Sequence, residues 1–378
     1  MSLQVNNNAL NVMLVSTSYP KNAQDWQGRF IADMLQSLSE KPNLKLSLWA
    51  PPGEVPANVA TCLDTEDARQ LNDMLAGGGI AHIVRSKGLR GIFHVFSLLR
   101  MLRQAYRRQV RLDVAHVNWL QNALPLWGSK TPALVTVLGT DFALLSLPGM
   151  QTLLRIVLRQ RSCIIAPNAE WMQAKLQQAF GDLAEIRVIP FGVEKKWFTV
   201  QRRVPANAPK KWLVVTRITQ KKLGHLLDWC QGLMNEHREL HLFGPMQEQI
   251  TLPDWIHYHG PTNPTALSTE WFPQAAGLLT LSQHDEGRPQ VLLEAMAAGL
   301  PVIVSDIPGH RSLVRDQQTG WICDSPDKLR QALDFLDMAE NNTALGKAAQ
   351  DWIKTEIGTW DDCASRYETA YRDLMRKS

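Results

Sequence analysis

The sequence predicts an α/β fold with two domains, each built on a parallel β-sheet that is covered by helices. Three observations lead to this prediction. The chain has 378 residues, whereas one domain usually has about 100–150. Short apolar segments alternate with helical segments, which is typical of parallel α/β layers. The alternation stops at the polar segment Gln201–Lys210, which contains two prolines, and then starts again, so this segment is predicted to be a linker.

Short apolar segments predict the strands of the first domain. These are Val12–Ser16, Leu44–Trp49, Asp113–Val117, Ala133–Val137, Cys163–Ala166 and Ile186–Ile189. A polar loop, Thr17–Gly28, follows the first strand and leads into a helix that is predicted to end near Ser39. A second helix is predicted over Ala169–Phe180, between the last two strands.

The second domain repeats the pattern. Its predicted strands are Trp212–Val215, Leu240–Phe243, Ile256–His259, Leu278–Leu281, Pro301–Val304 and Gly320–Cys323. Helices are predicted over Leu223–Glu236 and Val291–Ala298. Because open α/β sheets bind ligands at the carboxyl ends of their strands, a ligand-binding cleft between the two domains is predicted.

The composition is that of an ordinary globular protein, with 45% hydrophobic and 20% charged residues, which excludes a disordered or fibrous protein. No uncharged apolar segment reaches the roughly 18 residues of a membrane span. The first residues do not resemble a signal peptide, so a cytoplasmic protein is expected. The five cysteines lack the spacing of a zinc site or a disulfide framework.

Positive charge is concentrated in the first half of the chain. Residues 1–200 contain 21 lysines and arginines against 14 acidic residues. The segment Arg85–Arg111 has eight cations and no acid, with Ile92, Phe96, Leu99, Leu102 and Tyr106 at helical spacing. Arg100, Arg103 and Arg107 fall on a different face of this predicted helix.

This basic helix has three interpretations. It is a solvated outer helix whose apolar side packs on the sheet, or a surface that meets anionic lipid head groups. The third interpretation, a nucleic-acid surface, is disfavoured because no known nucleic-acid motif accompanies the cations, so no nucleic-acid partner is expected.

The segment Ser282–Ala298 (SQHDEGRPQVLLEAMAA) carries the strongest chemical signal. Pro289 suits the first position of a helix, where its missing N–H costs nothing. The free backbone amides of Gln290 and Val291 then form a site for a phosphate-like anion. Glu294 lies one turn deeper on the same face, where its carboxylate suits the vicinal diol of a ribose. Glu286 lies before the helix and suits the hydroxyls of a sugar.

Arg217 and Lys222 form a second cluster, directly after the strand Trp212–Val215. Two cations at a strand end can hold a diphosphate and stabilise the charge that grows on it as it leaves. Lys221 competes with Lys222 for this role. Together the two segments predict a site for a nucleoside diphosphate joined to a sugar. Metal ligands are not predicted, because the acidic segment Asp64–Asp67 and the pair Asp361–Asp362 lack a strand-end context.

These motifs resemble the glycosyltransferase family 4 group. Glu286 and Glu294 have the E-x7-E spacing of retaining glycosyltransferases, and EGRPQVLLEAMAAGLPVIVSDIPGHRSLV is similar to the family core throughout. VTRITQKKLGHLLD resembles the Arg…Lys segment of the family, and IRVIPFGVEKKWF resembles the end of its first domain. STSYPKNAQDWQGRF, VTVLGTDF and GTWDDCASRYETAYRDLM are similar to its first loop, an interior stretch and its closing helix.

The resemblance implies the GT-B architecture, with two Rossmann-like domains facing across a cleft. The expected divisions are an acceptor-side domain over residues 1–200, a linker over 201–210, a nucleotide-sugar-binding domain over 211–356, and a helix over 357–378 that returns to the first domain.

The resemblance also implies roles for single residues. Arg217 and Lys222 bind the donor diphosphate, Glu294 the ribose and Glu286 the donor sugar. The backbone from Gly287 through Arg288, Pro289 and Gln290 to Val291 meets sugar and phosphate. Arg288 departs from the family, which commonly has an apolar residue here, and its side chain is expected to contact either the donor or only solvent. Gly28 lets the first loop approach the phosphate. Asp141 and His116 are further candidates near the cleft.

The predicted function is therefore retaining transfer of a sugar from a UDP- or GDP-sugar to a glycan or lipid-linked acceptor, in cell-surface polysaccharide synthesis. No cofactor and no metal is expected, and the basic helix could hold the enzyme on the inner membrane face. Two alternatives remain open: a non-catalytic glycosyltransferase-like binding subunit, and a sugar-nucleotide epimerase of the same fold. A dehydrogenase is disfavoured because no GxGxxG follows Val12–Ser16.

Overall fold

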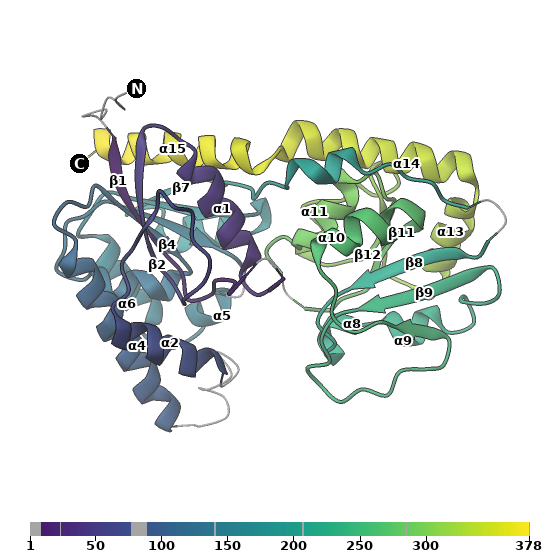
Figure 1. Ribbon diagram of the computed structural model, residues 1–378, viewed down its shortest axis with the longest axis horizontal. Helices are drawn as coiled ribbons and strands as arrows, with labels where there is room; N and C mark the ends of the chain where they lie inside the picture. The colour runs from purple at the N-terminus through teal and green to yellow at the C-terminus, as the bar shows by residue number, and fades with distance from the viewer. Residues whose placement is uncertain are drawn as a thin grey trace. The chain divides into compact units, whose positions relative to one another are not determined.

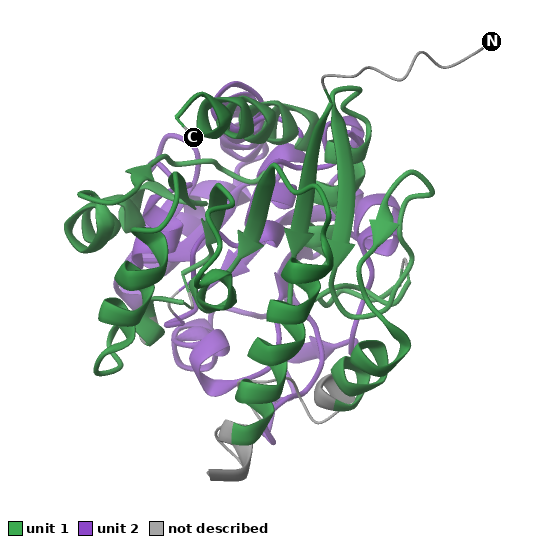
Figure 2. Cartoon of the chain, turned by 90° about the vertical axis from the view of Figure 1, so that its left-hand side faces the viewer, with its two compact units in different colours: residues 1–191, 360–378 green, residues 192–359 purple. Residues whose placement is uncertain are grey.

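The structure is a computed structural model, which describes residues 9–22, 24–76, 89–139, 141–205, 208–284 and 286–377. The chain folds into two compact units (Figure 2). Unit 1 comprises Met1–Phe191 and Trp360–Ser378, and unit 2 comprises Gly192–Thr359. The boundary thus lies at Phe191 rather than after Val200. The predicted linker packs on unit 2, where Arg203 N donates to Pro273 O over 2.5 Å.

Unit 1 is built on a parallel sheet with the strand order β3-β2-β1-β4-β5-β6-β7. The strands are β1 (Leu10–Val15), β2 (Leu44–Trp49), β3 (Ala60–Thr61), β4 (Val114–Asn118), β5 (Ala133–Val137), β6 (Cys163–Pro167) and β7 (Glu185–Ile186). The strand order reverses between β1 and β4, which are parallel neighbours. The loops that follow these two strands therefore begin side by side at the carboxyl-end edge of the sheet. All six strands predicted for this half of the chain are present within a few residues of their predicted bounds.

Alternate residues of these strands enter two separate cores, because successive side chains of a strand point to opposite faces. Met13 and Val15 of β1 face a core with α4, while Val12 and Leu14 face a core with α1 and α15. The helices of unit 1 are α1 (Arg29–Ser39), α2 (Thr65–Ala76), α4 (Leu89–Arg108), η1 (Leu120–Leu126), α5 (Phe142–Leu145), α6 (Met150–Leu158), η2 (Glu170–Met172), α7 (Gln173–Phe180) and α15 (Trp360–Arg376).

The closing helix α15 is part of unit 1, although 168 residues of unit 2 separate it from β7 and its loop. It packs against α1, as Figure 1 shows in yellow and purple. Tyr367, Tyr371 and Leu374 are fully buried in this contact with the sheet. Arg187, after β7, forms an ion pair with Asp373 of α15 at 2.8 Å.

Unit 2 is built on a parallel sheet with the order β10-β9-β8-β11-β12-β13, which is the dinucleotide-fold order 3-2-1-4-5-6. Its strands are β8 (Lys210–Val215), β9 (Arg238–Phe243), β10 (Ile256–Tyr258), β11 (Ala275–Thr280), β12 (Val302–Ser305) and β13 (Trp321–Cys323). They correspond one by one to the six predicted strands. The order reverses between β8 and β11, which are paired in parallel.

Helices cover both faces of this sheet, and its strands alternate between two cores. The helices of unit 2 are η3 (Lys195–Thr199), α8 (Gln220–Leu223), α9 (Leu226–Cys230), α10 (Pro264–Ala266), η4 (Leu267–Trp271), η5 (Phe272–Gln274), α11 (Gln290–Ala297), α12 (Pro308–Arg311), α13 (Pro326–Asp337), α14 (Ala339–Trp352) and η6 (Ile353–Ile357). None of the helices in the described ranges is long and apolar enough to cross a bilayer.

Two helix predictions need correction. The helix predicted over Leu223–Glu236 is broken at Gly224 and Gly232, which adopt positive φ values of 54° and 73°. Only α9 lies within the predicted range, and α8 ends at its first residue, Leu223. In α4, Phe96 is 66% exposed instead of lying on the buried side, which is formed by Leu98, Met101, Leu102, Ala105 and Tyr106. Arg85 and Lys87, predicted for the same helix, lie outside the described residues.

Candidate functional site

The chain reversal in the unit 2 sheet brings the two predicted motifs together. Lys222 follows β8 and Glu286 follows β11, and these strands are neighbours whose carboxyl ends share one edge. Lys222 Nζ forms an ion pair with Glu286 Oε1. Both side chains are mostly shielded, with 12% and 17% of their surface exposed. Lys221, by contrast, is exposed.

Backbone hydrogen bonds hold the two loops together. Gln283 N donates to Lys221 O at 2.9 Å, and His225 N donates to Leu281 O at 3.1 Å. Gly224 makes this approach possible: a Cβ at this position would lie 2.0 Å from Leu281 O. The position of Lys222 is therefore set by the end of β11, the same strand that leads to Glu286.

Arg217 lies at the start of the same loop, shortly after β8, and is half-buried. Its Nη1 donates to Gln247 Oε1 at 3.5 Å, a long contact. Ile218 fixes the backbone here, because its N donates to Pro245 O at 2.9 Å while its O accepts from Gln247 N at 3.1 Å. The Arg217 charge is close enough to Lys222 to act on it.

Burial lowers the pKa of Lys222 from its usual value, because the ammonium loses solvation. The Glu286 carboxylate opposes this shift, and the Arg217 charge adds to it. Lys222 is thus a cation whose charge is only partly compensated, beside a second cation. An anion at this place would interact favourably with both.

The helix α11 begins next to this pair. Its first residue is Gln290, and Pro289 is its N-cap with φ −65° and ψ 121°, one position earlier than predicted. Pro289 O accepts from Leu292 N and Leu293 N. Across the described residues, the backbone amides of Gln290 and Val291 have no hydrogen-bond acceptor, as expected of helix N-termini. The Gln290 side chain donates to Gly192 O at 2.9 Å.

The remaining predicted residues of this segment surround the start of α11. Gly287 is buried, and its carbonyl faces Gly309, where a Cβ would lie 3.2 Å from it. Arg288 is 6% exposed, so it does not lie in solvent, and its Nη2 is 3.4 Å from Ser312 O. Glu294 is half-buried in the second turn of α11. The predicted residues of unit 2 therefore gather at one end of the sheet.

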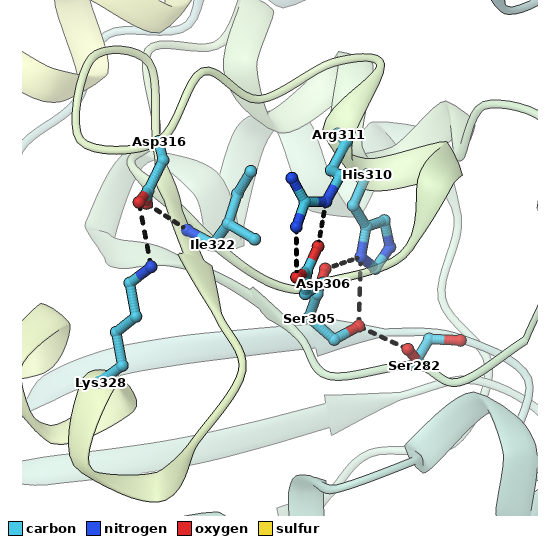
Figure 3. A network of polar contacts seen from close by, with 8 residues as sticks. All are labelled: Ser282, Ser305, Asp306, His310, Arg311, Asp316, Ile322 and Lys328. Carbon is cyan, nitrogen blue, oxygen red and sulfur yellow. Dashed lines mark hydrogen bonds and ion pairs between the residues drawn. The ribbon is translucent and has the colours of Figure 1, made fainter. Parts of the chain in front are cut away.

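His310 is a neighbour of this site that the sequence analysis did not single out. It lies in α12, directly after β12, and is fully buried. Its Nδ1 donates to Ser305 O at 2.9 Å, and Ser305 Oγ in turn donates to Ser282 O, as Figure 3 shows. Burial lowers the pKa of His310, while the nearby Glu286 carboxylate partly opposes this. The signal in the sequence was its place after a strand, at the edge where Glu286 also lies.

In unit 1, Gly28 is the N-cap of α1 with φ 71°. A Cβ here would lie 2.7 Å from Ser18 Oγ and 2.8 Å from Tyr19 N, so the loop after β1 can close on itself only over a glycine. At the neighbouring end of β4, Trp119 adopts φ 67° and ψ 133°. A positive φ is rare for a bulky residue and marks local backbone strain.

His116 and Asp141 are both buried in unit 1. Both ring nitrogens of His116 have partners, Tyr371 Oη at 2.6 Å and Thr136 Oγ1 at 2.8 Å. Burial lowers its pKa to about 3. Asp141 accepts from Leu138 N at 2.9 Å, and burial raises its pKa to about 6. These contacts give both residues a structural role, and a site role for either remains a prediction.

Comparisons with known proteins agree with this arrangement. Residues 198–356 match the family model of glycosyl transferases group 1, which spans the second unit. The chain is 26% identical over 214 residues to the amylovoran biosynthesis glycosyltransferase AmsK of Erwinia amylovora, covering 51% of this chain and 52% of that protein. It is 28% identical over 130 residues to a D-inositol 3-phosphate glycosyltransferase of Streptomyces scabiei, covering 34% and 28%. The chain thus spans about half the length of these relatives or less.

Solved structures extend the likeness to both units. Sucrose-phosphate synthase from Thermosynechococcus elongatus is 16% identical with a TM-score of 0.72, over 98% of this chain and all of that one. HepE from Anabaena, solved with UDP, is 12% identical with a TM-score of 0.66, over 96% and 100%. A trehalose-6-phosphate synthase, studied for glycosyl transfer with retention, is 13% identical with a TM-score of 0.70, over 96% and 99%. The chain has the two-domain α/β fold of the GT-B glycosyltransferases, and its second unit matches the model of glycosyl transferases group 1.

Proposed function

We propose that this protein is a retaining glycosyltransferase, which moves a sugar from a UDP- or GDP-sugar to a glycan or lipid-linked acceptor in cell-surface polysaccharide synthesis. The observation that carries the proposal is the Lys222–Glu286 ion pair at the strand reversal of unit 2, beside the start of α11. It joins a cation suited to a diphosphate with a carboxylate suited to sugar hydroxyls. The UDP bound by HepE and the match to glycosyl transferases group 1 support it.

The proposed roles follow from chemistry. Arg217, Lys222 and the amides of Gln290 and Val291 hold the diphosphate, since cations and helix N-termini both favour anions. Glu294 accepts hydrogen bonds from the ribose diol, and Glu286 from the donor sugar. Lys222 is released from Glu286 as the diphosphate takes over its charge.

In the reaction, the bond between the anomeric carbon and the diphosphate oxygen breaks, and a bond to the acceptor oxygen forms on the same face. The acceptor proton passes to the leaving diphosphate, so no nucleophile of the protein is required. Arg217 and Lys222 stabilise the negative charge that grows on the diphosphate. In this scheme the two cations do the work that a metal does elsewhere, and we propose that transfer is metal-independent.

Calorimetric titration of the full chain with UDP, GDP, ADP and their common sugar conjugates, with and without EDTA, tests the proposal. We expect one nucleotide to bind with an affinity that EDTA does not change. A donor that binds should then yield, with an acceptor, a product whose anomeric configuration by NMR matches the donor. Binding that disappears in EDTA would contradict metal independence. Release of an epimerised nucleotide sugar without acceptor would favour an epimerase, and binding of no nucleotide would favour a non-catalytic subunit.

A further inference from the structure

The outward face of α4 combines aromatic and cationic side chains. Phe93 and Phe96 are 75% and 66% exposed, although apolar side chains of this size are usually buried. Arg100 and Arg107 are exposed on the same helix, and Arg103 is half-buried beside them. At about 100° per residue these five positions fall within an arc of about 100°, opposite the buried side of α4. We call them the α4 face.

Among the residues that the structure describes, the cations of this face have no acidic partners. Across the described ranges, Arg100, Arg103 and Arg107 form no ion pair. Arg103 Nη1 donates instead to the carbonyl of Trp127 at 2.9 Å, and Trp127 is itself 62% exposed. The next arginine, Arg108, differs: it turns toward α2 and pairs with Asp64 at 2.7 Å. The α4 face is therefore a positive surface with two exposed aromatic rings, and the exposed Trp127 lies beside its Arg103.

We propose that the α4 face docks the protein on an anionic lipid surface. Charge complementarity favours this partner, because unpaired arginines attract acidic head groups. The exposed rings supply a second contribution, since aromatic side chains prefer the boundary between head groups and acyl chains. The buried side of α4 packs on η1 and the sheet, so the helix does not enter the bilayer along its length. The proposed docking surface is therefore the exposed side of a helix that is already packed in a folded domain.

This docking does not depend on the proposed reaction, because it needs neither donor nor acceptor. It would bring unit 1 to the surface on which a lipid-linked acceptor resides. The sequence analysis left open whether the apolar side of this helix packs on the sheet or meets lipid, and the exposed Phe96 ring favours a surface role for its part of the helix.

The test is flotation of the full chain with vesicles of phosphatidylglycerol and phosphatidylcholine in equal parts, or of phosphatidylcholine alone. We expect much stronger binding to the anionic vesicles than to phosphatidylcholine alone, and weaker binding to the anionic vesicles at high salt. Replacing Arg100, Arg103 and Arg107 by Glu should lower the partition coefficient at least about tenfold, since each cation near the surface contributes about one RT or more. F93S with F96S should leave salt-sensitive binding but remove the part that persists at high salt.

Matched control variants distinguish an effect of the α4 face from a general effect of the protein's net charge. Replacing Arg330, Lys347 and Lys354 by Glu changes the charge equally, on exposed positions of unit 2, and should leave binding unchanged. F335S is the control for the exposed rings. The proposal is overturned if the wild type binds neither vesicle, if it binds both equally, or if the unit 2 control loses as much binding as the α4 variant. Preferential binding of a single-stranded oligonucleotide, or self-association through Phe93 and Phe96 without vesicle binding, would also overturn it.

Discussion

At the scale of single residues, Lys222 and Glu286 form an ion pair in the free protein, so each charge is partly compensated by the other. A ligand that binds Lys222 must therefore compete with Glu286. Removing Lys222 and removing Glu286 should consequently change the affinities for the nucleoside diphosphate and for the nucleotide sugar differently. Charge-assisted hydrogen bonds contribute about 1.5–3 kcal/mol each, which is about 10-fold to 100-fold in affinity.

Lys222→Ala should weaken binding of the nucleoside diphosphate by about this factor. Glu286→Ala should leave that binding unchanged or strengthen it, because the variant frees Lys222 and removes a negative charge beside the diphosphate. Glu286→Ala should nevertheless weaken binding of the nucleotide sugar and abolish transfer. Calorimetry with both ligands checks this, with Lys221→Ala as the exposed control. Parallel losses in both variants would remove the proposed division of roles.

His116 and Asp141 give opposite contributions to the pH dependence of stability. Between pH 6.5 and 3 the unfolded chain binds a proton at His116 that the folded chain does not, so acid destabilises the fold here. Between pH 6 and 3.8 the folded chain holds a proton at Asp141 that the unfolded chain lacks, so acid stabilises it. From about pH 6 to pH 4 the two contributions partly cancel.

Asp141→Asn should remove the stabilising contribution and leave that of His116. The variant should therefore lose stability on acidification more steeply than the wild type, by about 1.4 kcal/mol per pH unit between pH 6 and pH 4. Urea denaturation of both proteins over this range measures the difference. Equal slopes would mean that the pKa of Asp141 is not raised in the folded protein.

At the scale of elements, the candidate site depends on how closely α8 approaches the end of β11. Gly224 allows this contact, and a side chain there would meet the Leu281 carbonyl at 2.0 Å. Gly232 has a similar positive φ but no atom within 4 Å of its added Cβ. A substitution at Gly232 therefore measures only the cost of a positive φ with a side chain. A substitution at Gly224 adds the steric clash with the end of β11.

Gly232→Ala should cost about 1 kcal/mol, the strain of a positive φ with a side chain. Gly224→Ala should cost more, and it should also weaken nucleotide binding, because α8 must shift and Lys222 moves away from Glu286. Denaturation together with calorimetric titration tests both effects. If the two variants behave alike in binding, the close approach of α8 to β11 does not position Lys222.

At the scale of the whole molecule, each unit has its own cores, yet unit 1 is completed only by the last helix of the chain. α15 buries Trp360, Cys363, Tyr367, Tyr371 and Leu374 against α1 and the sheet. Burying one such aromatic side chain contributes about 1.5–3 kcal/mol, so the loss of several is comparable to the whole stability of a typical domain.

A chain that ends at Thr359 should therefore contain an unfolded unit 1 and a folded unit 2. Limited proteolysis should degrade residues up to Phe191 rapidly and leave a resistant fragment near Gly192–Thr359. Adding the α15 segment as a separate peptide should restore part of the protection. A truncated chain in which both units resist proteolysis equally would show that α15 is not required for the fold of unit 1.

Local sequence patterns determined much of this protein. All predicted strands occur, because short apolar segments bounded by turns encode a buried parallel strand locally. The start of α11 was predicted within one residue from Pro289, since proline restricts its own φ. The residues that gather at the candidate site of unit 2 were named from the sequence, by spacing and by resemblance, and their binding roles stay predictions.

Tertiary structure decided what depends on distant parts of the chain. Lys222 and Glu286 are 64 residues apart, and they meet only because β8 and β11 are neighbours at the reversal of the sheet. His310 is a neighbour of the site for a similar reason, because it follows β12, which pairs with β11. Phe96 fits either side of a helix by spacing alone, and the packing of α4 on η1 turned it outward. These features depend on how helices and strands pack against one another. The spacing of apolar residues within one element does not specify which neighbour its faces meet, because that is decided by which packing buries the most apolar surface.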